Sequence, residues 1–349
     1  MKPYRRWPQC RLRTLLAAML LLSCGFAWLG WQVRQAVGQR RAVEWLQDCG
    51  VIVELRNSNS WMGRSDWIQS QLGYAATAEV VGVDFGPWPV NEDALQTLSK
   101  FTQLEKLTLR GKEVSDESLL HLRGLLQLWS LDLSETRVTD QGLAHLSGLR
   151  RLEFLSLSRT QVTDAGLQHL SSLTRLKILQ LDETQVKGED LSGLQTLEQL
   201  KTLQLDGAPF TGEGLAALEG LPQLQFLRLY KTKLNDEAML HMGRLAFLTH
   251  LTLDHTPVTD QGLANLRGLK QLEHLSLNHT QVTDEGLSSL SRLPRLSWLK
   301  LNSTLVTDAG LPRLSGMTQL KLVSLVDAKA TDDGVARLQA QLPNATVYR

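Results

Sequence analysis

The chain has 349 residues, a formal net charge of +1 and 42% hydrophobic residues. This hydrophobic fraction is sufficient for a packed core and excludes a disordered chain. The near-neutral charge argues against a nucleic-acid-binding protein, because such proteins are usually strongly basic. The three scattered cysteines, Cys10, Cys24 and Cys49, cannot form a disulfide framework, and their spacing is not that of a metal site.

The near-zero total charge conceals two parts of opposite sign. Residues 1–43 carry eight Lys and Arg side chains and no acid, because the first acidic residue is Glu44. The remaining 306 residues carry 29 basic and 36 acidic side chains, which gives them a net charge of −7. Length alone would suggest two or three domains. The charge distribution instead divides the chain into a short basic N-terminal part and a long acidic remainder.

An uncharged segment of twenty residues, 14–33, lies inside the basic part. A helix of that length spans about 30 Å, the hydrocarbon thickness of a bilayer. Trp28 and Trp31 near its end fit an interfacial aromatic belt, and the excess of basic residues before it favours a cytoplasmic N-terminus. We therefore expect a basic cytoplasmic segment at 1–13 and an uncleaved transmembrane signal anchor at 14–33.

Two other export signals compete with the anchor. Gly25-Phe26-Ala27 fits a small-residue cleavage site of a signal peptide. Residues 21–24, which end at Cys24, resemble a lipoprotein signal, although Leu22 fits poorly and the residues that follow stay apolar. A buried helix of a soluble domain is disfavoured by the basic flanks on both sides. All three export signals predict an extracytoplasmic body, and the anchor predicts a single-pass membrane protein.

From Val80 the sequence repeats every 24 residues without an insertion. Apolar residues recur at positions 1, 4, 6, 11, 16, 19 and 22 of each unit, and eleven units place them in 76 of 77 slots. The exception is Gln341, in the last unit, where a repeat array becomes atypical. This regularity predicts one continuous array over residues 80–343, with units that start at Val80, Leu104, Leu128, Leu152, Leu176, Leu200, Leu224, Leu248, Leu272, Leu296 and Leu320.

The columns of the repeat translate into local structure. Apolar positions 4 and 6 alternate with polar positions 3, 5 and 7, which predicts a short strand with one buried face. Positions 16, 19 and 22 predict about two turns of helix. Position 12 is usually Thr or Ser and position 13 is usually Asp, so each helix should begin with a hydroxyl cap and an acid that complements its dipole. Since no such unit can bury its own leucines, the units must stack into a parallel sheet.

Two further columns carry small residues. Thr at position 9 should satisfy backbone amides of a buried turn with its hydroxyl. Gly at position 15 is costly in a helix, so we expect neighbouring coils to approach closely there. The Thr residues are Thr136, Thr160, Thr184, Thr232, Thr256, Thr280 and Thr304, and the glycines are Gly142, Gly166, Gly214, Gly262, Gly286, Gly310 and Gly334.

The pattern LxxLxLxxTxVTDxGLxxLxxLxx resembles the leucine-rich repeat family over about three quarters of the chain. It is most similar to the cysteine-containing subtype of F-box proteins, with Thr in place of Asn or Cys at position 9. A membrane anchor before TDxGL repeats also resembles exported proteins of planctomycete-type bacteria. The resemblance implies a right-handed α/β solenoid, a horseshoe with a concave parallel sheet and short convex helices, that binds partners on its concave face. The ubiquitin-ligase role of F-box proteins is not carried over, because a membrane segment stands where an F-box would be.

The ends of the array and two internal units depart from the pattern. Residues 34–79 should form a juxtamembrane segment and N-terminal cap, with helices near 38–48 and 67–72, a strand near 51–55 and a polar loop between them. Residues 344–349 should add a C-terminal edge strand. Lys187-Gly188 and Gly212 interrupt the Thr-Asp pairs of two adjacent units, so we expect altered turns there.

The expected concave face contains an unusual set of apolar and aromatic side chains. Position 3 should point to solvent, yet it holds several large apolar residues in neighbouring units. Exposed aromatic residues in a line commonly mark an interaction surface, and Arg and Tyr are enriched at binding hot spots. The alternative is that neighbouring side chains merely cover one another. The predicted partner-binding residues are Phe154, Ile178, Phe226, Arg228, Tyr230, His250, His274 and Trp298.

Four histidines lie on the same face in two pairs, His250 with His274 and His255 with His279. The members of each pair occupy adjacent strands and should approach within about 5 Å, while the pairs lie about 16 Å apart. A metal site or a pH switch is therefore open as an alternative to simple repeat duplication, and no metal or cofactor is predicted.

Catalytic motifs for hydrolases, metalloproteases and phosphate-binding enzymes are absent from the sequence. The predicted function is therefore non-catalytic binding of a protein or peptide by a membrane-anchored solenoid, with no nucleic-acid partner. The alternative is a cell-envelope scaffold without a defined ligand patch, and an unrecognised enzyme is the third hypothesis.

Overall fold

The computed structural model describes residues 12–57, 65–111 and 113–349. The predicted cytoplasmic segment 1–13 and the polar loop of the N-terminal cap fall mainly outside these residues. The chain divides into two compact units, Met1–Val80 and Val81–Arg349.

The first unit consists of a long helix followed by small elements. Its elements are α1 (Leu12–Asp48), β1 (Ile52–Arg56), α2 (Asp66–Leu72) and α3 (Tyr74–Thr77). Gln39 Nε2, on α1, donates hydrogen bonds to the carbonyl oxygens of Ala75 and Ala78 at 3.0 and 2.6 Å. Ala36 and Ala76 form a small buried cluster, against which Ile68 and Leu72 pack.

The N-terminal helix also bears on the predicted membrane anchor. Within the described part of the chain, no helix combines the length and the apolarity that a membrane crossing requires. The side chains of residues 14–18 lie outside the described part of the chain, so the transmembrane span predicted for residues 14–33 stays a prediction.

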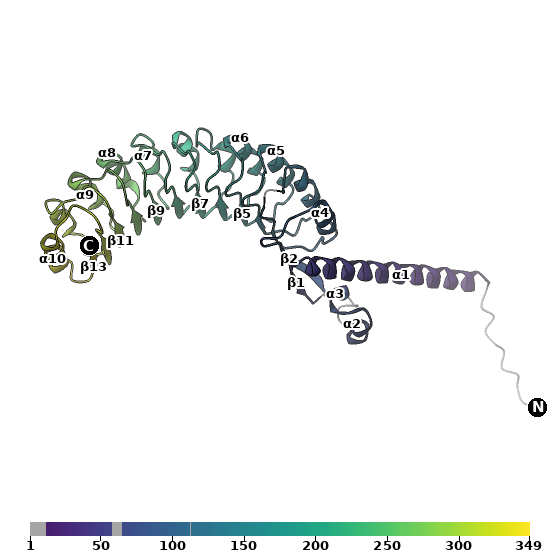
Figure 1. Ribbon diagram of the computed structural model, residues 1–349. Coiled ribbons are helices and arrows are strands. Elements are labelled where there is room, and N and C mark those ends of the chain that lie inside the picture. The colour runs from purple at the N-terminus through teal and green to yellow at the C-terminus, as the bar shows by residue number, and fades with distance from the viewer. Residues whose placement is uncertain (1–11, 58–64, 112) are drawn as a thin grey trace, which may run out of the picture. The chain divides into compact units, whose positions relative to one another are not determined.

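The second unit is built on short parallel strands whose order in space is their order in the sequence (Figure 1). Each pairs with its neighbour in the same register, so that every residue lies beside the residue 24 positions away, as His250 lies beside His274. The strands are β2 (Glu79–Asp84), β3 (Lys106–Thr108), β4 (Ser130–Asp132), β5 (Phe154–Ser156), β6 (Ile178–Gln180), β7 (Thr202–Gln204), β8 (Phe226–Arg228), β9 (His250–Thr252), β10 (His274–Ser276), β11 (Trp298–Lys300), β12 (Leu322–Ser324) and β13 (Thr346–Tyr348).

Short helices lie on the opposite side of each coil, so that within this unit the strands line the inner side of an arc and the helices its outer side (Figure 1). Many of these helices are 3₁₀, which agrees with the three-residue spacing of positions 16, 19 and 22. They are α4 (Glu92–Leu98), η1 (Glu117–Leu122), α5 (Asp140–Leu143), η2 (Ala144–Leu146), α6 (Asp164–Leu167), η3 (Gln168–Leu170), η4 (Ser192–Leu194), η5 (Glu213–Leu218), α7 (Met239–Met242), α8 (Asp260–Leu263), η6 (Ala264–Gly268), α9 (Asp284–Leu290), η7 (Leu311–Leu314) and α10 (Asp332–Gln341).

The apolar columns of the repeat form the core between strands and helices. Of the apolar residues at the seven column positions, all but Val335 are buried, most of them completely. The leucines of one coil thus pack against those of the next, as the burial of apolar area by stacking requires.

Where position 13 is Asp, its carboxylate connects the coil to the next one. Asp140 Oδ1 accepts a hydrogen bond from the backbone N–H of Thr163 at 2.8 Å, and its Oδ2 accepts one from the Thr163 hydroxyl at 2.6 Å. Thr163 Oγ1 in turn accepts from the N–H of Ala165 and caps α6, as predicted. The same bonds recur for Asp116, Asp236, Asp260, Asp284 and Asp308.

The glycines at position 15 fit against these carboxylates. A Cβ atom at Gly166 would collide with Oδ1 of Asp140, and Gly142, Gly262, Gly286, Gly310 and Gly334 stand in the same relation to the preceding Asp. The predicted close approach of neighbouring coils is confirmed at these positions, and its specific cause is the Asp–Thr hydrogen bonding.

The threonines at position 9 have a different role from the one predicted. All seven are buried, but each hydroxyl donates to the backbone carbonyl three residues earlier in its own coil, as Thr280 Oγ1 does to Leu277 at 2.7 Å. The prediction that they satisfy amides was wrong: the tight turn leaves a buried carbonyl, and the hydroxyl proton satisfies it. The equivalent bonds involve Thr136, Thr160, Thr184, Thr232, Thr256 and Thr304.

The two irregular units do have altered turns. Gly188 and Gly212 adopt left-handed φ angles of 75° and 87°. Phe210, which replaces the usual Val at position 11, is fully buried, and a Cβ at Gly188 would collide with its ring. Glycine at 188 therefore makes room for the larger core side chain.

Candidate partner-binding face

The inner face of the second unit is formed by positions 3, 5, 7 and 8 of each coil. On strand β8 the burial alternates, with Phe226 and Arg228 exposed and Leu227 buried between them. Because the strands share one register, the position-3 side chains of β8 to β11 lie in a single line across the sheet.

This line is a continuous stack of rings, which we call the aromatic column: Phe226, His250, His274 and Trp298. The ring centroids are 4.3 Å apart for Phe226 and His250, 4.1 Å for the two histidines and 5.2 Å for His274 and Trp298. Neighbouring planes are inclined by 11° to 23°, so each ring covers the face of the next. The predicted approach of His250 to His274 is confirmed. The end members Phe226 and Trp298 are 36% and 39% exposed.

A second stack, the outer column, consists of Tyr230, His255 and His279. The His255 and His279 rings are stacked at 4.0 Å, and Tyr230 meets His255 edge-on at 5.2 Å. Both histidines have a left-handed backbone with φ of 56°. Lys231 has the same conformation, and its Nζ lies 5.3 Å from the Tyr230 ring centroid.

The left-handed residue is a general feature of position 8. It occurs at Glu135, Arg159, Glu183, Lys231, His255, His279, Ser303 and Asp327, and Gly111 and Gly207 also have positive φ at this position. Such a conformation is uncommon for non-glycine residues, and the variety of side chains gave no indication of it in the sequence. It lies three residues beyond the end of the strand and turns the chain into the bend at position 9.

The stacked histidines are held toward their neutral forms. Burial lowers the pKa of His250, and the neighbouring His274 lowers it further, while Glu273 raises it. Burial likewise lowers the pKa of His274, which Glu273 raises and Lys300 and Lys321 lower.

In the outer column, burial is again the first cause that lowers the pKa of His255. His279 and Lys231 lower it further, and Asp254 raises it. The histidine pair therefore disfavours the doubly protonated state in the absence of a ligand.

The remaining predicted residues lie outside these stacks. Phe154 and Ile178 are register partners on β5 and β6, and Thr202 separates Ile178 from Phe226. Arg228 Nη2 is paired with Asp206 Oδ2 at 2.5 Å, and the other oxygen of Asp206 accepts from the backbone N–H of Tyr230. The structure thus brings six of the eight predicted residues together over β8 to β11.

An Asp/Asn ladder at position 7 supports this face. Asp182 accepts from the N–H of Asp206, Asp254 from that of Asn278, and Asn278 from that of Asn302. Burial raises the pKa of Asp182, and the charge of Asp206 adds to this rise, while the Asp206 N–H and Arg228 lower it.

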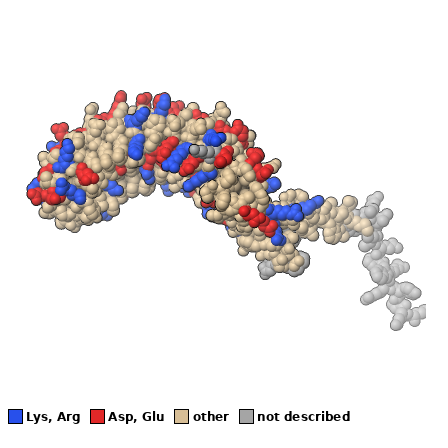
Figure 2. Space-filling view, in the orientation of Figure 1, with Lys and Arg blue, Asp and Glu red and all other residues tan. Residues whose placement is uncertain are grey.

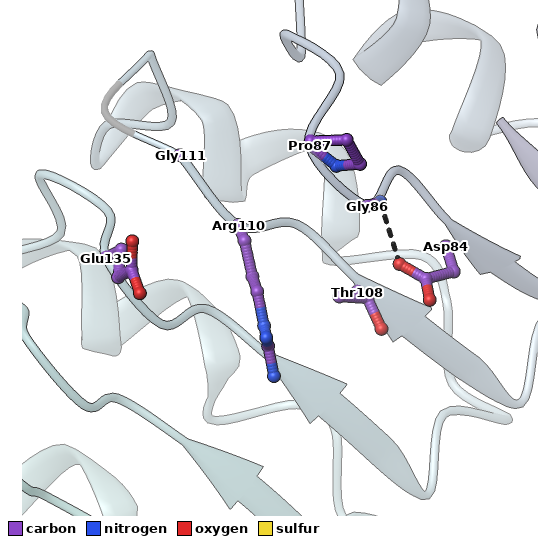
Figure 3. A pocket seen from close by; sticks show the side chains of 7 residues that line it. All are labelled: Asp84, Gly86, Pro87, Thr108, Arg110, Gly111 and Glu135. Carbon is purple, nitrogen blue, oxygen red and sulfur yellow. Dashed lines mark hydrogen bonds between the residues drawn. The ribbon is translucent and has the colours of Figure 1, made fainter. Parts of the chain in front are cut away.

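Sequence reasoning missed a polar pocket at the start of the repeat unit. It has a volume of about 570 Å³ and is lined by Asp84, Gly86, Pro87, Thr108, Arg110, Gly111 and Glu135 (Figure 3). The Arg110 guanidinium donates twice to Asp132, at 2.9 and 2.7 Å, and this carboxylate raises the pKa of Arg110. Pro87, which departs from the pattern in the first 24-residue repeat, was the indication of this pocket in the sequence.

The outer surface of the arc has a different character. Figure 2 shows basic and acidic side chains interspersed over it, without a large area of one sign. In the described residues, no three His, Cys, Asp or Glu side chains are grouped so that they could hold a metal ion.

Comparisons with known proteins agree on the fold. Residues 270–291 match a family model described as "Leucine Rich repeat". No curated protein sequence matches the chain. An internalin from Listeria monocytogenes is similar in structure, with 20% identity and a TM-score of 0.53 over 78% of this chain and 90% of that one.

Two further structures are also similar. The match to the mouse RP105/MD-1 complex has 24% identity and a TM-score of 0.58, and covers 73% of this chain and 44% of that one. The match to a TDR receptor has 20% identity and a TM-score of 0.51, and covers 73% and 48%. Similarity at this level shows the fold: the second unit is a leucine-rich repeat solenoid. The likeness to the F-box subtype stays a prediction.

Proposed function

We propose that this chain binds a protein or peptide partner, without catalysis, through the face formed by β8 to β11. The aromatic column carries the proposal, because it is a continuous row of rings on the strand side of the solenoid whose end members are more than one-third exposed. Clustered aromatic residues beside Arg and Tyr are typical of binding hot spots. The leucine-rich repeat fold supports it, and among its structural neighbours RP105 is found in a complex with MD-1.

The test replaces the exposed ends of the column. A chain with Phe226 and Trp298 both changed to Ser should lose capture of its partner by crosslinking in the native cell envelope. The control changes exposed apolar residues outside the inner strands, Leu120, Leu240 and Phe247, to Ser. Capture that survives in the first variant would favour the alternative, a cell-envelope scaffold without a ligand patch.

We further propose the location expected from the sequence, with a cytoplasmic N-terminus, residues 14–33 in the membrane and the repeats outside it. Its support is the uncharged segment between basic flanks. N-terminal sequencing of the protein extracted from membranes tests this proposal. An intact N-terminus is expected, and a start after Ala27 would instead show a cleaved signal peptide.

A further inference from the structure

The two histidine-containing columns raise the question of what kind of partner they fit. In the aromatic column each ring covers the face of its neighbour, so the rings of His250 and His274 present their edges to the solvent side. Ring edges carry the positive part of the aromatic quadrupole, and the histidine N–H groups lie there too. A ligand that needs an open ring face, such as a quaternary ammonium ion, does not fit, whereas a carboxylate does.

The hydrogen bonds of His250 show which ring nitrogen is free to take up a proton when the ring becomes charged. The Thr249 hydroxyl donates to the carbonyl oxygen of Gln225 at 3.1 Å, so its oxygen accepts from Nδ1–H of His250 at 2.9 Å. In the neutral ring Nε2 then carries the lone pair, and no described residue makes a hydrogen bond to it. Protonation at Nε2 creates a charged N–H donor, from which a ligand carboxylate would accept a hydrogen bond.

The charges around the two columns favour an anionic ligand. The charged groups around the two columns are Arg228, Lys231, Lys300 and Lys321, opposed by Asp206, Asp254 and Glu273. This gives a small positive excess even with all four histidines neutral. The chain beyond residue 43 has a net charge of −7, so this part of the face differs in sign from the average of the body.

We propose, on the basis of the proposed function, that the partner presents an extended acidic peptide segment across β8 to β11, and that its binding protonates the stacked histidines. Three strand spacings of about 4.8 Å make the aromatic column about 14 Å long, which corresponds to roughly four extended residues. Carboxylates of such a segment lie against the ring edges and compensate the repulsion between two stacked imidazolium rings. Partner capture is therefore coupled to pH and strengthens under mildly acidic conditions.

The direction of this coupling follows from linkage. In the free protein, burial and the like charges of the neighbouring histidine and lysines keep the pKa of His250, His255 and His274 below the ordinary histidine value. A bound carboxylate raises these pKa values, so protons are taken up on binding. Each proton taken up strengthens binding by up to about tenfold per pH unit between the free and bound pKa values.

The experiment titrates the full chain with a fluorescent poly-aspartate peptide of about ten residues, which is long enough to span the column. We expect the dissociation constant at about pH 5.5 to be at least about tenfold lower than at about pH 7.5. Calorimetry in buffers of different ionisation enthalpy should show net proton uptake. A poly-lysine peptide of equal length should not bind.

Two variants assign the effect to the columns. H250Q/H274Q and H255Q/H279Q should each lose a large part of the pH dependence, and the second pair keeps the assay informative if the first unfolds. The matched control is H145Q/H169Q, which removes two histidines from the short helices η2 and η3. This control should bind poly-aspartate as the unchanged chain does.

Three results would overturn the proposal: binding of poly-aspartate that is independent of pH, equal loss in H145Q/H169Q, or equally tight binding of an inorganic polyphosphate. The last result would show a general anion patch. Because this assay uses no natural partner, partner capture that depends on the column but not on pH would refute the acidic-peptide inference and leave the proposed function standing.

Discussion

At the scale of single residues, the repeat uses short polar side chains as connections between coils rather than as surface decoration. Asp at position 13 and Asp or Asn at position 7 each accept hydrogen bonds from the backbone of the following coil. These bonds satisfy amides that stacking removes from water, and an unsatisfied buried amide is costly. Small changes at such positions are therefore expected to have measurable effects.

Asp182 provides a test of charge at position 7. Burial and the nearby Asp206 raise its pKa, so the folded state binds more protons than the unfolded state between the two pKa values, and stability falls as pH rises through that window. Asn278 and Asn302 make the same type of bond without a charge. We expect Asp182→Asn to raise the thermal midpoint at about pH 7, with a gain that shrinks on acidification. A lower midpoint at neutral pH would contradict this.

Gly166 provides a test of the close approach between coils. A Cβ at this position collides with Asp140 and displaces it from Thr163, so Gly166→Ala should destabilise the protein by about 1–3 kcal/mol. Gly148 is a matched control, since a Cβ there meets nothing within 4 Å. Gly148→Ala should be neutral or slightly stabilising in urea unfolding, and equal losses in the two variants would refute the role assigned to Gly166.

At the scale of elements, the typical coil is a short strand, a left-handed residue, a bend closed by a Thr hydroxyl and a short helix. Thr280 shows what closes the bend, because its buried hydroxyl is the donor to the Leu277 carbonyl. Thr280→Val keeps the shape but leaves that carbonyl unsatisfied, at an expected cost of about 1–3 kcal/mol. Val at exposed Thr196 is the control in the same unfolding measurement, and a Thr280→Val variant as stable as this control would refute the assignment.

The histidine stacks also belong to this scale, because they arise from equal register in adjacent strands. A lowered histidine pKa in the folded state means that the unfolded state binds more protons in the window below the ordinary value. Stability is therefore expected to fall as pH decreases from about 7 through the histidine range. H250Q/H274Q should flatten this dependence in thermal unfolding, and an unchanged slope would show that other groups cause it.

At the scale of the whole array of coils, contacts between nearest-neighbour coils supply most of the stability. Deletion of residues 128–151 removes one complete period and brings Asp116 to Thr163, so that the Asp–Thr bond and the apolar columns can form again. We expect this shortened chain to fold and unfold cooperatively and to keep poly-aspartate binding. Deletion of residues 128–139 shifts the columns by half a period and should prevent folding, as circular dichroism would show. Equal behaviour of the two deletions would contradict a stack of equivalent coils.

The repeat pattern was sufficient to predict the periodic core, the caps of several helices and the face on which the aromatic residues lie. This was possible because burial depends on a local pattern. Leu recurs at the same positions of every coil, and a glycine such as Gly166 occupies the position where a neighbouring coil approaches closely. The pattern also placed His250 beside His274, since equal spacing in a stacked array implies equal register.

Properties that depend on the distance and orientation between coils could not be predicted from the repeat pattern and became visible in the folded chain. These are the stacking of Phe226, His250, His274 and Trp298 into one column, the left-handed residue at position 8, the acceptor of the Thr280 hydroxyl and the hydrogen bonds of Asp140 to the next coil. The physical reason is that a repeat pattern specifies which residues are neighbours, whereas ring planes, turn geometry and hydrogen-bond partners follow from how closely the coils pack.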